Sequence, residues 1–187
     1  MKLKLVAFIV FFLFVTNAFS QEENNTAILK ILLTKYYANE KVIVKDRLQL
    51  LSFYCKKAPN NEETLEVIGK SKLLKDNAKE IKAQINVTID EDWSKEFNNL
   101  FAKEHQYLKS KVNKCLSLEE FQVVSKRFND NNQRLMIVNK PMYFAKKYCL
   151  VKVAFYRNIE HNSSRFFLFE NVNGVWTIKE TLNEWET

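Results

Sequence analysis

The last third of the sequence alternates between apolar and polar side chains in three runs separated by short polar links. "KYCLVKVAFYRNI" is followed by "EHNSS", then by "RFFLFENV" and, after Asn173 and Gly174, by "VWTIKETL". A period of two residues is typical of strands, and short links favour antiparallel neighbours. Upstream, "RLMIV" and "MYF" flank Pro141, which cannot donate a ladder hydrogen bond and predicts a strand edge or break. Residues 135–185 are therefore predicted to form an antiparallel β-meander.

Asn173 and Gly174 predict a two-residue hairpin turn in this meander. Both central positions of a type I′ turn need a positive φ angle, which asparagine and glycine adopt at low cost. Gly174 is one of only two glycines in the 187 residues. Backbone geometry thus explains it without a ligand, and Trp176 is predicted to be a core residue of the last strand.

The chain over 25–130 has mostly the apolar spacing of helices. Helical residues are predicted over 25–57, as two helices or one bent helix, with Ile28, Ile31, Leu32 and Tyr36 among the apolar positions. Helical periodicity returns over 62–84, with an interruption near Gly69. "INVTI", at 85–89, alternates like a short strand.

Two pairs of residues have the spacing of a capping box, in which two side chains satisfy each other's backbone donors at a helix start. They are Thr88 with Glu91 and Ser117 with Glu120. The pairs predict helix starts near residues 89 and 118.

Helices first and strands last are typical of the α+β class. We expect the N-terminal helices to pack on a curved antiparallel meander, an arrangement similar to the cone-shaped fold of nuclear transport factors. No stretch rich in glycine, proline or serine divides the chain, and no internal repeat is evident. Residues 21–187 are therefore expected to form one domain, helical over 25–130 and with its sheet over 135–185.

The first 20 residues have the three parts of a secretory signal peptide. Two lysines precede eleven consecutive apolar residues, "LVAFIVFFLFV", and the small residues Ala18 and Ser20 precede the expected cleavage site. Eleven apolar residues are fewer than the roughly 20 that cross a bilayer. We expect residues 1–20 to be removed and the mature protein to be periplasmic or secreted, without a stable membrane anchor.

Charge and composition argue against several classes of partner. The net charge of +7 becomes +5 when the two lysines of the signal segment are removed, and the remaining lysines are interspersed with acidic residues. Nucleic-acid binding would need basic side chains concentrated on one face, so no nucleic-acid partner is expected. With Gly69 and Gly174 as the only glycines, a glycine-rich nucleotide cradle is excluded, and no cofactor is expected.

Three cysteines follow the signal segment: Cys55, Cys115 and Cys149. Their wide spacing matches no pair of metal ligands, and no metal site is expected. An oxidising compartment permits one disulfide, and the sequence leaves all three pairings open. Buried, unpaired cysteines are an equally good interpretation.

The stretch "IDEDWSKE" is the main candidate for a site. Paired carboxylates suit acid–base work on a glycosidic bond or the binding of a hard cation. Acidic residues at a helix start also oppose the positive end of the helix dipole, and the sequence favours this simpler interpretation. His161 lies in a polar loop and would be a poor metal ligand alone. The candidate site residues are Asp90, Asp92, Glu96 and His161.

About 50 residues at the C-terminus resemble part of a group of exported proteins. "VNKPMYF", "YCLVKVAFY" and "FFLFENVNGVWTIKETLNEW" look like the C-terminal region of uncharacterised exported proteins of Gram-negative bacteria, which share S-K-P-x-F, N-G-x-W and a final tryptophan. The matching positions are Asn139, Lys140, Pro141, Asn173, Gly174, Trp176 and Trp185. Asn139 replaces the usual serine and Tyr143 the usual phenylalanine, and "NIEHNSS" lacks the loop cysteines and glycines of many members. The resemblance implies a secreted protein of mixed helix and sheet, with structural roles for these residues.

Two functional hypotheses follow. The first is a non-catalytic binding or interaction module for a small-molecule ligand or a protein partner. The second is a small exported hydrolase that uses the carboxylates of residues 90–96 or His161. A cleft that gathers these carboxylates near His105 or His161 would favour the hydrolase, because catalytic groups must converge. A solvated helix end would favour the module.

Overall fold

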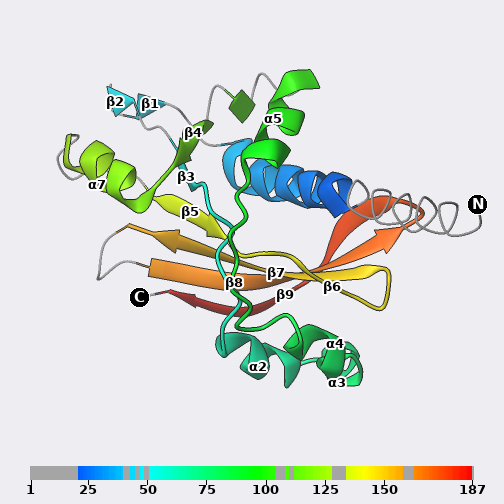
Figure 1. Ribbon diagram of the computed structural model, residues 1–187. Coiled ribbons are helices and arrows are strands. Elements are labelled where there is room, and N and C mark those ends of the chain that lie inside the picture. Colours follow the sequence, from blue (N-terminus) through cyan, green and yellow to red (C-terminus); the bar gives the residue numbers. More distant parts are fainter. Residues whose placement is uncertain are drawn as a thin grey trace, which may run out of the picture.

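The computed structural model describes residues 21–39, 43–44, 47–48, 51–103, 108–109, 112–127, 134–157 and 162–186. It has helices above and below a mixed, open sheet (Figure 1), which confirms the α+β class. Residues 21–37 are helical and lie on one face of the sheet together with α5 (Ser94–Lys103). The other face carries three short helices, α2 (Glu63–Ile68), α3 (Lys72–Asp76) and α4 (Ala78–Lys82).

The larger sheet has the strand order β4–β3–β5–β7–β8–β9, and β6 also pairs with β7. Its strands are β3 (Leu51–Tyr54), β4 (Val112–Leu116), β5 (Leu135–Val138), β6 (Met142–Phe144), β7 (Tyr148–Tyr156), β8 (Asn162–Val172) and β9 (Val175–Glu186). β3 runs parallel to β4 and β5, whereas the pairs from β5 to β9 are antiparallel. The predicted antiparallel meander is thus present, and two strands from the middle of the chain extend it.

Pro141 lies at a break between strands, as predicted. β5 pairs with the C-terminal half of β7 and β6 with its N-terminal half, so Pro141 falls between two short strands that share one partner. The backbone N–H of Asn139 donates to the carbonyl of Lys152 across the break at 3.0 Å. The missing amide of proline therefore costs no ladder hydrogen bond here.

Both faces of the central strands are buried. In β8, Phe167 and Phe169 pack into the core beneath the helix of 21–37 and α5, while Phe166 and Leu168 pack against α2, α3 and α4. The four consecutive apolar residues "FFLF" are the sequence signature of a strand that is covered on both sides. Two layers of helices therefore cover the sheet, one on each face.

The helical prediction for 25–57 is correct only for its first part. Ile28 and Leu32 are fully buried within the helical residues 21–37. After them come β1 (Ile43–Val44), β2 (Arg47–Leu48) and β3 instead of a second helix. β3 is held by backbone pairing on both sides, and short apolar runs do not distinguish helix from strand.

The helices predicted over 62–84 are confirmed, with a break at Gly69, which ends α2. The strand predicted over 85–89 is wrong, since this segment is irregular and contains Asn86 at a positive φ of 58°. The backbone N–H of Asn86 donates to the carbonyl of Asn60 rather than to a neighbouring strand.

One of the two capping boxes is confirmed. The N–H of Ser117 donates to Oε2 of Glu120, and the N–H of Glu120 donates to Oγ of Ser117, at 2.8 and 3.1 Å, just before α7 (Leu118–Arg127). The helix start predicted near residue 89 is wrong, because the next helix begins at Ser94. There the side chain of Asp92 accepts the N–H of Ser94 at 2.8 Å.

A disulfide joins Cys55, which follows β3, to Cys115 in β4, and Cys149 is buried and free. The parallel pairing of β3 with β4 brings the two Cα atoms to 4.7 Å. A cross-link over 60 residues removes about 4 kcal/mol of loop entropy from the unfolded chain in the chain-entropy description. The bond anchors β4 at the edge of the sheet.

The Asn-Gly hairpin has the predicted geometry. Asn173 and Gly174 have φ angles of 54° and 86° between the paired residues Val172 and Val175. Trp176 is 6% exposed in the core and its Nε1 donates to Oδ1 of Asn24 at 2.9 Å.

Trp185 is 40% exposed and donates to Glu63 of α2 at 3.1 Å. It therefore ties the last strand to a helix at the surface. Among the described residues, no helix is long and apolar enough to cross a membrane.

Replacing Gly174 by valine should lower the free energy of unfolding by about 1 kcal/mol or more, because a branched side chain is strained at a φ of 86°. A Cβ at this position would meet no atom within 4 Å, so the loss of stability would come from the backbone angle and not from a steric clash. Urea unfolding measures this loss. Asn173→Gly is the matched control and should leave stability unchanged or slightly raised. An unchanged Gly174→Val variant would contradict the turn.

Candidate functional site

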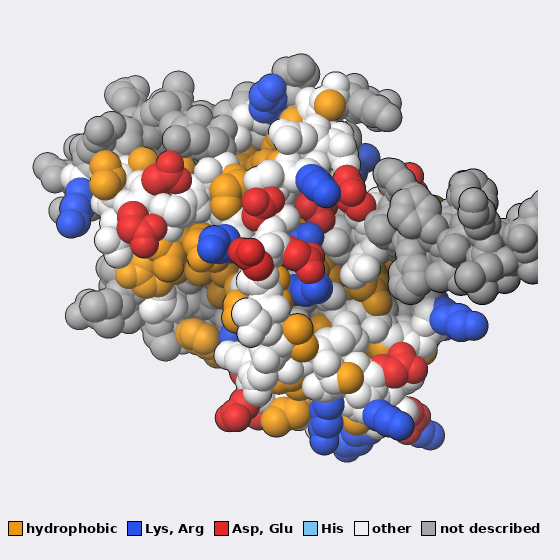
Figure 2. Space-filling view, in the orientation of Figure 1, with side chains coloured by type: hydrophobic (Ala, Val, Ile, Leu, Met, Phe, Trp, Pro, Cys, Tyr) orange, Lys and Arg blue, Asp and Glu red, His pale blue; other side chains and the backbone are white. Residues whose placement is uncertain are grey.

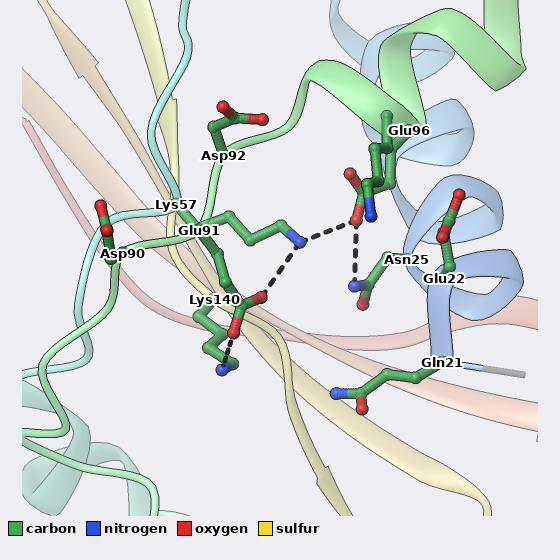
Figure 3. A pocket seen from close by; sticks show the side chains of 10 residues that line it. Gln21, Glu22, Asn25, Lys57, Asp90, Glu91, Asp92, Glu96 and Lys140 are labelled. Atoms are coloured by element: carbon green, nitrogen blue, oxygen red, sulfur yellow. Dashed lines mark hydrogen bonds and ion pairs between the residues drawn. The ribbon is translucent and has the colours of Figure 1, made fainter. Parts of the chain in front are cut away.

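A surface cleft of about 470 Å³ opens beside residues 21–25 of the N-terminal helix (Figure 3). Four separate parts of the chain line it: that helix, the segment after β3, the segment leading into α5, and the turn before β6. Its lining residues are Gln21, Glu22, Asn25, Lys57, Asp90, Glu91, Asp92, Lys95, Glu96 and Lys140.

Lys57 forms the floor of the cleft. Its side chain is only 6% exposed, and its Nζ lies 2.7 Å from Oε1 of Glu96 and 3.3 Å from Oε2 of Glu91. The ammonium also lies 5.0 Å from the centre of the Trp93 ring, which is fully buried. Two carboxylates and an aromatic face thus compensate the desolvation of this charge.

Backbone hydrogen bonds place Lys57 opposite the acidic segment. The N–H of Lys57 donates to the carbonyl of Glu91 at 3.0 Å, and the N–H of Trp93 donates to the carbonyl of Cys55 at 2.9 Å. Lys56 and Asp92 form an antiparallel bridge between the two segments. Because Cys55 is fixed by the disulfide, the lysine and the carboxylates face each other over a short, rigid span.

A chain of hydrogen bonds runs from the ion pair into the protein. Nδ2 of Asn25 donates to Oε1 of Glu96 at 3.2 Å, and the hydroxyl of Tyr143 donates to Oδ1 of Asn25 at 2.7 Å. Burial raises the pKa of Tyr143 above its ordinary value, and Cys149 and Glu96 nearby raise it further. The phenol therefore stays protonated and fixes the orientation of the amide.

Glu91 and Lys140 form a second ion pair at the cleft wall (Figure 3). Partial burial alone would raise the pKa of Glu91, but the hydrogen bonds and charges of Lys140 and Lys57 outweigh it and hold that pKa below its usual value. The backbone of Lys140 is held in place, because its amide N–H donates to the backbone carbonyl of Ala58 at 2.8 Å.

The predicted site residues have different outcomes. Glu96 is 2% exposed and points into the cleft instead of lying on a solvated helix end. Asp92 accepts the N–H of Ser94 at the start of α5 and lines the cleft. The exposed Asp90 also lines the cleft. His161, like His105, lies outside the described residues, so the approach of a histidine to these carboxylates, the condition that would favour the hydrolase, is not tested.

Sequence reasoning missed the groups that complete the site. Lys57 stands in "CKKAP" and Asn25 in "EENNT", and neither context has a catalytic or binding pattern. In the sequence, Tyr143 and Lys140 stand out only as positions of the family resemblance. The only feature of the sequence that pointed to these groups was the acidic cluster. A buried carboxylate is normally paired with a cation, so burial of any member implies a nearby lysine or arginine.

The cleft holds a mixed but unequal set of charges. Five carboxylates and three ammonium groups line it, so its net charge is negative although the whole chain is basic. Within the described residues, no group of three or more histidine, cysteine, aspartate or glutamate side chains could hold a metal ion. The arrangement is suited to binding polar, charged groups.

No family model, curated protein or solved structure matches this chain.

Replacing Lys57 by methionine should lower the free energy of unfolding by about 3–5 kcal/mol, because Glu96 would be left buried without its cation. Chemical denaturation measures the loss. Adding Glu96→Gln should recover most of it, since the neutral amide needs no counter-charge. Lys56→Met is the matched control, as Lys56 is exposed and should change stability by less than about 0.5 kcal/mol. Equal effects at positions 56 and 57 would contradict the buried ion pair.

Glu91 should make stability depend on pH in the acid range. Its pKa is lowered in the folded protein, so its contribution is complete above the unfolded pKa of about 4.3 and is lost as pH falls through the folded pKa. Glu91→Gln should therefore be less stable than the parent at pH 7, by at most about 1 kcal/mol since the group is half-exposed, and equally stable near pH 2. Unfolding curves at both pH values check this. A difference that stays constant with pH would contradict the assignment.

Proposed function

We propose that this protein is an exported, non-catalytic binding module that uses the cleft around Lys57 to bind a small polar ligand with a positively charged group. The buried ion pair between Lys57 and Glu96 at the floor of the cleft carries the proposal. Three parts of this proposal have separate support: export, the binding role and the class of ligand.

Export is supported by two independent features. The first 20 residues have the pattern of a signal peptide. The disulfide between Cys55 and Cys115 is a bond that persists in oxidising compartments and is rare in the cytosol. A periplasmic or secreted location accounts for both features.

The buried ion pair supports a binding role because it is a costly way to build a fold. Replacing such a pair by packed apolar side chains is often neutral or stabilising. Here Lys57 and Glu96 are 6% and 3% exposed, yet they line an open cleft. Charges that are pre-oriented at a cleft floor can recognise a polar ligand without a reorganisation cost.

The charge balance of the cleft supports a cationic ligand. Of the three lysines in the cleft, Lys57 and Lys140 are already paired with Glu96 and Glu91, and only the exposed Lys95 offsets the other three carboxylates. Asp90, at the rim, is exposed and accepts no hydrogen bond from the described residues. A ligand with an ammonium or guanidinium group would find free carboxylate oxygens there.

The hydrolase hypothesis has less support from this geometry. A general acid needs a carboxyl whose pKa is raised towards neutrality. Glu91 has a lowered pKa, and Glu96 is engaged by Lys57 and Asn25. Glu91 therefore lacks the raised pKa of a general acid.

Isothermal titration calorimetry with spermidine, a small polycation, tests the proposal. Because the chain is basic overall, general electrostatics opposes this ligand, and binding must come from a local acidic site. We expect a dissociation constant below about 1 mM, a free energy of about −4 kcal/mol. Citrate, a small polyanion, should not bind in the cleft.

Asp90→Asn should weaken spermidine binding at least threefold, while Asp76→Asn provides a matched control. Both aspartates are exposed, and Asp76 lies in α3, outside the cleft. No heat of binding with the parent protein, or an equal loss in the two variants, would reject the cleft as the site.

A further inference from the structure

We propose that α3 and α4 carry a binding surface for anionic phospholipid bilayers, which is independent of the cleft. Four lysines of these helices, Lys72, Lys75, Lys79 and Lys82, form what we call the lysine stripe. They follow one another at intervals of three, four and three residues, and all four are exposed.

The stripe lies opposite the buried side of the two helices. Leu74 and Ile81 are fully buried and pack against Phe144, Phe166 and other residues of the lower sheet face. With the apolar positions held by the sheet, the lysines are left on the solvent side of an amphipathic layer. Figure 2 shows lysine and arginine side chains gathered at the end of the molecule where Figure 1 places α3 and α4.

The stripe gives α3 and α4 a net charge of +2, because Asp76 and Glu80 in the same helices offset two of its four lysines. Within the described part of the chain, no carboxylate forms an ion pair with any of its four ammonium groups. Glu80, the nearest acid in α4, instead accepts the backbone N–H of Ala145 at 2.9 Å. The seven ion pairs among the described residues are made by other lysines and by Arg165.

The composition of the stripe favours a membrane surface over a nucleic acid. All four cations are lysines, and the chain contains no arginine between Arg47 and Arg127. Arginine is the residue suited to bidentate recognition of single phosphates, whereas lysine acts as a point charge. The helices also contain no aromatic side chain on which a base could stack. A row of point charges on a protruding layer matches a flat surface of many phosphate groups.

The contribution of the lysine stripe to membrane binding is large enough to measure. Each lysine near an anionic bilayer raises partitioning by about fivefold at low salt. The attraction weakens with ionic strength, because exposed charges are screened over about 8 Å at 0.15 M. This surface would hold the protein at a membrane without any inserted segment.

Vesicle co-sedimentation tests the inference, with the chain from residue 21 onwards and vesicles of phosphatidylcholine containing about 30% phosphatidylglycerol. The protein should bind these vesicles in 50 mM salt and should lose at least tenfold in partitioning in 500 mM salt. Pure phosphatidylcholine vesicles should bind little. Absence of binding to the anionic vesicles would overturn the inference.

Matched variants separate the stripe from general attraction of a basic protein. The stripe variant changes Lys72, Lys75, Lys79 and Lys82 to glutamine, and the control variant changes the exposed Lys30, Lys56, Lys109 and Lys126 to glutamine. Both lose four charges, and thermal melts should show that both remain folded. The stripe variant should lose at least tenfold in partitioning and the control less than threefold.

Equal losses in the two variants would overturn the inference. So would stripe-dependent binding of a DNA duplex under conditions in which anionic vesicles do not bind, because this result would assign the stripe to a different class of partner.

Discussion

The architecture depends on burial of both faces of the central strands. β7 and β8 present apolar side chains alternately to the two sides, as with Phe167 and Leu168. A sheet of this kind is stable only if each face is covered. The helix of 21–37 and α5 cover one face, and α2 to α4 cover the other (Figure 1). The chain must therefore cross from one side of the sheet to the other, and the segments that do so build the cleft.

The crossing segments are held to the sheet by backbone pairing. Ala58 bridges Asn139 in parallel, and the N–H of Ala58 donates to the carbonyl of Val138 at 3.2 Å. Lys57 is thereby placed between the sheet and the segment that leads into α5. Its side chain is only 6% exposed, so Glu96 and Glu91 compensate the desolvation of its charge. The polar cleft follows from where the chain crosses the sheet edge.

Local patterns predicted the features that depend on nearest neighbours in sequence. The Asn173–Gly174 turn, the Ser117–Glu120 capping box and the break at Pro141 are examples, because φ angles and orphan backbone donors are properties of a few adjacent residues. The misassigned segments needed distant partners. β3 is a strand because β4 and β5 pair with it on both sides. Glu91 does not cap a helix because two lysines from other elements bind it.

The candidate site shows the same division. The acidic stretch was visible in the sequence, but its meaning depended on Lys57, Asn25 and Tyr143, which lie 39, 71 and 47 positions from Glu96 by residue number. Likewise, the side of α3 and α4 that is buried depends on Phe144 and Phe166 of the sheet, which are distant in sequence. The sequence by itself determined the α+β class, the hairpin and the Ser117–Glu120 helix cap, since these follow from periodicity and local backbone chemistry. Only the tertiary structure decided the disulfide pairing and the charge partners, because both depend on which distant segments the two buried faces of the sheet bring together.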